Sequence, residues 1–301
     1  MIGRFFITVS GFTLISRITG FIRDILIAKF LGTNPITEAF FVALKLPNLF
    51  RKFFAEGAFN SAFVPIFSDR QDNKDDLSAG RFAAQIFLLM SVIMLFLVIL
   101  FQLLMPFVVY LIAPGFQDNR DLIITTIELS RITFPYLLFI SLATVLAGVL
   151  NSMSKFAVVA VMPIFFNLSL IISLYIDPKY IFTQAHALAW GVYFAGVIQL
   201  LWITFFARKY IKFPKYDKKF FKISEDLKLF WKKFIPGVLG AGVTQLNLLI
   251  DIIIATFFTG AVAFLYYPDR VAQLPLALIG TTMTTALLPT LSKSVAKKDN
   301  Q

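Results

Sequence analysis

The chain has 301 residues, of which 58% are hydrophobic and 15% charged, and its formal net charge is +11. Soluble domains average about 45–50% apolar and about 25% charged residues, so this composition indicates an all-α, polytopic integral membrane helix bundle. The absence of cysteine excludes disulfides and thiolate sites, and with the single His186 a histidine-based metal site or catalytic triad is not expected.

Eight segments are long and apolar enough to be expected as transmembrane helices, which need about 20 residues each. The first, 4–31, has no signal-peptide cleavage site and is expected to be kept as a helix. The second, 36–54, is followed by an acidic and basic stretch at 69–76, which we interpret as a solvated connector rather than a metal site. The other six are 82–113, 132–154 with a start near 121, 156–176, 184–207, 234–258 and 264–291.

The basic residues predict the orientation of these spans. With a cytoplasmic N-terminus, 20 of the 28 Lys and Arg residues would face the cytoplasm and three the opposite side. This split follows the positive-inside rule, so both termini are predicted to be cytoplasmic.

The densest basic segment, 208–233, interleaves lysines with aromatic residues. One reading is that it lies on anionic lipid as an amphipathic segment, and the other is that it serves as a topology signal. The segment can have both roles. The segment divides the chain into an N-terminal six-helix lobe at 1–210, a basic cytoplasmic linker at 211–233 and two helices of a second lobe at 234–301.

Ionisable side chains interrupt the apolar spans, where each costs at least about 2.5–3.5 kcal/mol and marks a pathway or site by default. In the first span Arg17 and Asp24 are seven residues apart and share a helical face, and Ser16 and Arg23 repeat this spacing beside them. Gly20 lies between them and leaves room. Further ionisable residues in or beside the spans are Lys29, Glu38, Lys45, Arg51, Glu56, Arg131, Asp251, Asp269 and Arg270.

These charges have two readings. They either pair with one another and hold the bundle together, or the arginines line a cavity and bind an anion, because the planar guanidinium suits phosphate. A small basic surplus favours the second reading. Transport is favoured over an enzyme, because no span holds an Asp-x-x-Asp pair and no glycine-rich phosphate loop is present. The residues counted are Arg17, Arg23, Lys45 and Arg51 against Asp24, Glu38 and Glu56, with Arg270 joining from the eighth span.

Two blocks carry a resemblance to a known family. Residues 16–24, SRITGFIRD, and 37–67, TEAFFVALKLPNLFRKFFAEGAFNSAFVPIF, closely resemble the MurJ/MviN family of lipid II flippases. The family pattern runs S-R-x-x-G-F-x-R-D, A-F-F-V-A-x-K-x-P-N-L-x-R and F-A-E-G-A-F-x-x-A-F-V-P. Agreement continues at APGF (113–116), ITFPYLLFISLA (132–143), YYPDR (266–270) and LLPTLSKS (287–294).

The resemblance implies a MATE-like fold of the multidrug/oligosaccharidyl-lipid/polysaccharide exporter superfamily, with two six-helix lobes around a central cavity. It implies lipid II, the undecaprenyl-pyrophosphate-linked peptidoglycan precursor, as the substrate. Alternating access would move it from the inner to the outer leaflet of the bacterial inner membrane. Membrane potential or an ion gradient would drive this, with membrane lipids and a monovalent cation as further partners, no cofactor and no nucleic acid. The implied substrate-binding positions are Arg17, Arg23, Arg51 and Arg270 for the pyrophosphate, with Ser16, Asp24, Glu38, Glu56 and Asp269 as further functional positions.

The chain departs from the family in two ways. Glu38 stands where the family usually has Asp, so the carboxylate is kept but reaches farther. Members have about fourteen spans against the eight expected here, so we expect a truncated second lobe, or a partner that supplies its missing helices. Asp251, in the seventh span, either helps to bind a cation or contacts an absent helix. The alternative functions are a cation-coupled multidrug or polysaccharide exporter of the same superfamily and a non-transporting fragment.

Overall fold

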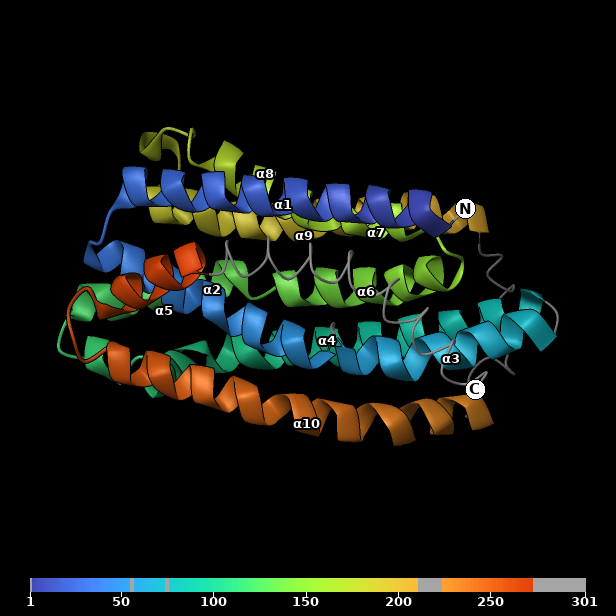
Figure 1. Cartoon of the computed structure of the whole chain (residues 1–301). Coiled ribbons are helices and arrows are strands. Elements are labelled where there is room, and N and C mark those ends of the chain that lie inside the picture. The colour runs from blue at the N-terminus through green and yellow to red at the C-terminus, as the bar shows by residue number, and fades with distance from the viewer. Residues whose placement is uncertain (1, 55–56, 74–75, 211–223, 273–301) are drawn as a thin grey trace, which may run out of the picture.

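The structure, a computed structural model, describes residues 2–54, 57–73, 76–210 and 224–272 (Figure 1). Over these residues the chain is built from helices and contains no strand. The long helices are α1 (Ile2–Leu31), α2 (Pro35–Phe54), α3 (Gly57–Asn73), α4 (Asp76–Ile112), α5 (Arg120–Thr133), α6 (Tyr136–Ser152), α8 (Met162–Ser173), α9 (Gln184–Tyr210) and α10 (Glu225–Ala255). Shorter elements are η1 (Pro114–Phe116), α7 (Phe156–Ala160) and η2 (Pro178–Tyr180), and a further helix occupies 261–272.

The predicted fold class, a membrane helix bundle, is confirmed. Five helical segments of the described chain are long and apolar enough to cross a membrane: Ser78–Ile112, Arg120–Ser152, Phe156–Ser173, Gln184–Arg208 and Glu225–Ala255. The first two predicted spans are helical as α1 and α2, and their crossing of the bilayer stays a prediction. The eighth, 264–291, lies outside the described residues beyond 272.

Helix α6 forms the centre of the bundle. Thirteen of its 17 residues are buried, and it packs against α4 and α9. Small residues allow this close approach, as they do in membrane proteins generally. A Cβ at Gly148 would lie 2.9 Å from the Phe63 ring, and one at Gly196 of α9 would lie 2.8 Å from the Tyr136 ring. Around this centre α1 packs on α8, and α8 on α9 (Figure 1).

Helix α3 differs from the sequence expectation, which treated 69–76 as a solvated connector. Residues 69–73 form the end of α3 instead. Phenylalanines at i, i+4 and i+8 stabilise one face of the helix. Their ring centroids are 5.2 Å apart for Phe59 and Phe63 and 5.6 Å apart for Phe63 and Phe67. Its polar end is held by Arg70, which donates to Asp226 at 2.6 Å.

Helix α10 runs along α3, and its first turns include part of the predicted linker. Residues 211–223 of that linker lie outside the described residues, whereas 225–233 are helical. Ser224 caps the helix by accepting from the Leu227 amide at 3.2 Å. Phe230 and Phe234 then pack against Phe59, with centroids 5.7 and 6.3 Å away. The first half of α10 is therefore anchored on the predicted six-helix lobe.

Candidate functional site

A cavity of about 1480 Å³ is lined by residues of α1, α2, α3, α6, α7, α8, α9, α10 and the helix at 261–272. It follows one face of α6, because the residues that line it there recur every three or four positions: Tyr136, Ile140, Thr144, Ala147 and Asn151. Fifteen residues of helix rise about 22 Å, so the cavity is a long channel-like space rather than a small pocket.

The cavity is positively charged. Its described lining holds six basic residues against three acidic ones, so a surplus of three positive charges faces a space with low-dielectric walls. Such a space focuses a positive potential and attracts an anion. The basic residues are Arg17, Arg23, Lys45, Arg51, Lys52 and Arg270, and the acidic ones are Asp24, Asp251 and Asp269.

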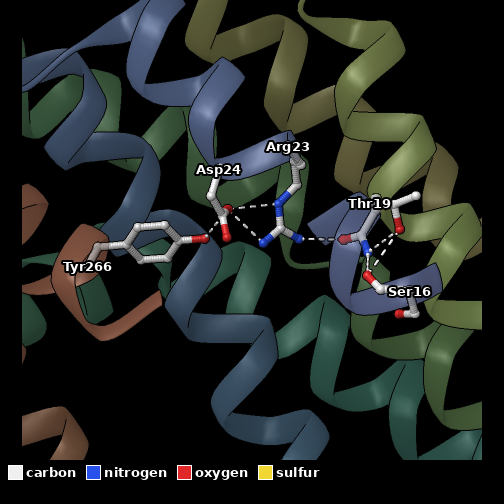
Figure 2. Close-up of polar contacts among 6 residues, drawn as sticks. Ser16, Thr19, Arg23, Asp24 and Tyr266 are labelled. Carbon is white, nitrogen blue, oxygen red and sulfur yellow. Dashed lines mark hydrogen bonds and ion pairs between the residues drawn. The ribbon is translucent and has the colours of Figure 1, made fainter. Parts of the chain in front are cut away.

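Arg23 and Asp24 of α1 form a buried ion pair, 8% and 7% exposed (Figure 2). The Arg23 Nε and Nη2 groups both donate to Asp24 Oδ1, at 2.9 and 2.7 Å. The Tyr266 hydroxyl, from the helix at 261–272, donates to the same oxygen at 3.2 Å. One carboxylate oxygen therefore joins α1 to the far side of the cavity.

Asn167 of α8 holds the other side of the Arg23 guanidinium. Its Oδ1 accepts from Arg23 Nη1 at 2.7 Å, and its Nδ2 donates to the Ser16 carbonyl at 2.8 Å and the Thr19 hydroxyl at 3.3 Å. Gly20 makes this possible, because a Cβ there would lie 3.3 Å from Asn167 Nδ2. The room that the sequence predicted at Gly20 is thus occupied by the Asn167 amide.

The helix at 261–272 is tied to α1 and α2 by aromatic and backbone contacts. Phe41 stacks on Tyr266, with centroids 3.9 Å apart, and the Tyr267 hydroxyl donates to the Gly32 carbonyl at 3.0 Å. Arg270 lies over the Tyr266 ring at 4.9 Å, a cation–π distance. These contacts hold the helix at 261–272 against the region where α1 ends and α2 begins (Figure 1).

Glu38 is 2% exposed and is not among the cavity-lining residues. Its Oε1 accepts from the Val262 amide at 3.1 Å, at the first turn of the helix at 261–272. A carboxylate at a helix N-terminus satisfies a free amide and complements the helix dipole. The structure thus places Glu38 as a cap that joins α2 to this helix.

The other predicted positions differ in whether they line the cavity. Glu56 lies outside the described residues. Arg17 is exposed in the cavity and forms no hydrogen bond or ion pair with the described residues. Asp251 also lines the cavity. Seven of the nine predicted substrate-binding residues line it: Ser16, Arg17, Arg23, Asp24, Arg51, Asp269 and Arg270.

The two readings of the charged stripe differ in what they expect of its arginines, and anion binding stays a prediction. Arg23 is paired structurally, as the first reading expected, whereas Arg17 is a cation open to the cavity, as the second expected. Sequence reasoning missed Asn167 and the role of Tyr266. A signal for Asn167 was present, because an amide within the apolar stretch MPIFFNLSLIIS needs a polar partner inside the membrane.

Comparisons with known proteins all identify the same family. The family described as lipid II flippase MurJ matches residues 27–301. A probable lipid II flippase MurJ from Rhizobium tropici is 40% identical over 302 residues, covering 96% of this chain and 55% of the relative. Lipid II flippase MurJ from Burkholderia cenocepacia is 35% identical, covering 99% and 58%.

A solved structure, lipid II flippase MurJ in an inward closed conformation, is 29% identical with a TM-score of 0.79. The match covers 95% of this chain and 59% of that one. The chain thus spans a little over half the length of the relatives that it matches.

Proposed function

The chain belongs to the MurJ family of lipid II flippases, and from this premise we propose that its cavity binds lipid II for transfer from the inner to the outer leaflet. The proposal assigns the pyrophosphate to the arginine-lined part of the cavity. No covalent step is involved, so the side chains are assigned binding and positioning roles rather than catalytic ones.

The observation that carries the proposal is the Arg17 guanidinium beside the Arg23 network. Arg17 lines the cavity and forms no hydrogen bond or ion pair with any residue that the structure describes, and the described lining has a surplus of three positive charges. A pyrophosphate supplies several negative charges and oxygens that accept paired N–H donors from arginine. Charge and donor geometry therefore both suit this anion.

The Arg23 network suggests how binding would act on the fold. In the structure Asp24 occupies two of the donors of Arg23 and accepts from Tyr266. A phosphate oxygen that takes over those donors would release Asp24 and weaken its bond to Tyr266. Anion binding would thereby loosen the contact between α1 and the helix at 261–272.

We further propose the orientation that the basic residues predict, with the N-terminus cytoplasmic. The end where Glu38 and Gly32 contact the helix at 261–272 would then face outward. Because the chain has no cysteine, single substitutions can report this directly. A membrane-impermeant thiol reagent should label Asp118→Cys from outside and Lys155→Cys only after permeabilisation, and the reverse pattern would overturn the orientation.

The test of substrate binding uses the 301-residue chain in lipid nanodiscs, titrated with lipid II. We expect Arg17→Gln to weaken binding about ten- to hundredfold, the range for losing a charged hydrogen bond. The matched control is Arg120→Gln, an exposed arginine at the start of α5 outside the cavity. Equal affinity of Arg17→Gln and the unmodified chain would remove the pyrophosphate role.

A cation-coupled drug exporter, the alternative from the sequence, would need an acidic or apolar cavity for cationic compounds. The positive lining opposes it. Displacement of lipid II by cationic drugs, but not by undecaprenyl pyrophosphate, would favour that alternative. Asp251 remains a proposed candidate for a coupling cation or for a contact with further helices of the second lobe.

A further inference from the structure

Two prolines interrupt the helices that form the cavity wall. Pro47 lies inside α2, and residues on both sides of it line the cavity, Lys45 before it and Arg51 after it. Pro135 separates α5 from α6, and the next residue, Tyr136, is the first residue of α6 in the cavity lining. Proline has no amide hydrogen, so it removes the hydrogen bond to the carbonyl four residues earlier and bends the chain there.

Each carbonyl that loses its amide partner in this way accepts a hydrogen bond from a side chain of another helix. Four residues before Pro47, the Ala43 carbonyl accepts from the Thr133 hydroxyl of α5 at 3.0 Å. Four residues before the second proline, the Arg131 carbonyl accepts from Gln102 Nε2 of α4 at 2.7 Å. In a membrane bundle no water replaces a lost backbone bond, so side chains of neighbouring helices take this role.

The bond from Thr133 to α2 is favoured over the alternative within its own helix. The Thr133 hydroxyl is fully buried and also lies 3.3 Å from the Ser130 carbonyl, but it has only one hydrogen to donate. The Ser130 carbonyl already accepts from the Phe134 amide at 2.9 Å. The Ala43 carbonyl has no such amide, because residue 47 is proline, so the hydroxyl stabilises the fold more by donating to Ala43.

The two hydrogen bonds connect α4, α5 and α2 in series at one level of the bundle. Their positions on α5, Arg131 and Thr133, are two residues apart, or about 3 Å along the helix. The same three segments also pack through Phe50, Phe101 and Phe134, whose ring centroids are 4.8 to 5.7 Å apart. A change in one bend therefore alters the contacts that hold the other.

We propose that Thr133 and Gln102 are positioning residues that join the bends at Pro47 and Pro135 into one hinge unit. The parts of the cavity wall contributed by α2 and α6 would then move together. Each residue acts through a backbone carbonyl of another helix, and neither lines the cavity. The inference goes beyond the proposed function, because it concerns how the wall is held and does not depend on which ligand the cavity binds.

Hydrogen exchange of backbone amides tests the hinge unit, measured by mass spectrometry on the 301-residue chain in lipid nanodiscs without ligand. Thr133→Val keeps the side-chain shape and removes the hydroxyl, so the Ala43 carbonyl loses its donor. The α2 amides at 44–53 should then exchange about five- to hundredfold faster, the range for leaving a buried carbonyl without a partner. Thr133→Ser keeps the hydroxyl and should recover most of the protection.

Pro47→Ala supplies the readout that a packing role of Thr133 would not change. Alanine has the amide hydrogen that proline lacks, so the Ala43 carbonyl regains a partner within α2. In the Pro47→Ala background, Thr133→Val should no longer accelerate exchange in α2. An equal acceleration with and without Pro47 would overturn the positioning role, and so would the absence of any acceleration by Thr133→Val in the chain that keeps Pro47.

Gln102→Leu tests whether the two bends are joined. It removes the donor to the Arg131 carbonyl, so the amides at 131–138 should exchange faster. In a joined hinge unit the α2 amides should also exchange faster, although Gln102 forms no hydrogen bond with α2. If exchange in α2 stays as in the unmodified chain, the bends are separate and the hinge unit is wrong.

Two matched controls remove the same kinds of group elsewhere. Thr126→Val removes an equally buried hydroxyl of α5 that donates within its own helix, to the Leu122 carbonyl. Gln117→Leu removes an amide that donates to the Tyr110 carbonyl, at the end of α4. Neither control should change exchange in α2, and an acceleration there as large as that of Thr133→Val would contradict the hinge unit.

Discussion

At the scale of single residues, the site depends on how completely one guanidinium is held. Arg23 makes three hydrogen bonds, two to its neighbour Asp24 and one to Asn167 on a different helix. The neighbouring pair could form in any helix that contains Arg-Asp. The Asn167 contact exists only in the folded bundle, so Asn167 is the residue that fixes where Arg23 points.

We therefore predict that Asn167→Leu weakens binding of undecaprenyl pyrophosphate about tenfold, because Arg23 loses its hydrogen bond to α8. Asn167→Gln, which keeps the amide, should recover part of the affinity. Titration in nanodiscs measures both, and Leu168→Ala, a change at the next and more exposed side chain, is the control. A loss that Asn167→Gln does not reduce at all would indicate a packing role instead.

At the scale of elements, the spans were predictable where apolar residues run without interruption, and α4, α6 and α9 confirm those predictions. The sequence also placed the start of the fourth apolar segment near 121, and α5 begins at Arg120. Two features could not be read in this way. The end of α3 is polar, so its composition suggested a loop. It is helical in the structure, where Arg70 forms an ion pair with Asp226, 156 positions along the chain. Glu38 was expected among the functional positions, and its cap role was not predictable because its backbone partner, Val262, lies 224 positions along the chain.

The α3 and α4 helices give a direct test of which apolar side chains form the core. Phe63→Ala should destabilise the fold by about 3–5 kcal/mol, because Phe63 is fully buried and stacks on Phe59, Phe67 and Phe82. Phe96→Ala, on α4, removes a side chain that is 63% exposed and predicted to face lipid, so its effect should be small. Unfolding titrations of both variants in detergent micelles measure the difference, and equal losses would contradict the described packing.

At the scale of the whole molecule, helices far apart in sequence are joined at one end of the bundle. Glu38 caps the helix at 261–272, Tyr267 bonds to Gly32, and the Gly115 amide donates to Thr256 at 3.1 Å. Glycine is required at 115, because a Cβ there would overlap the backbone of Thr256. The family resemblance implies two lobes around a cavity, and these contacts are the ones that the proposed alternating-access cycle would have to break.

Glu38 is the contact whose charge can be removed without changing its size. Glu38→Gln keeps the side-chain length and an acceptor oxygen but removes the negative charge at the start of the helix at 261–272. Caps and helix-dipole interactions contribute about 0.5–2 kcal/mol, so the open population at this end should rise about two- to thirtyfold. Spin labels on cysteines introduced at the exposed Thr33 and Thr259 report the opening as a longer distance. The control, Asp177→Asn, neutralises an exposed carboxylate paired with Lys179, and should leave the distance distribution unchanged. An unchanged distribution in Glu38→Gln would show that the aromatic contacts of Tyr266 and Tyr267 hold this end closed without the cap.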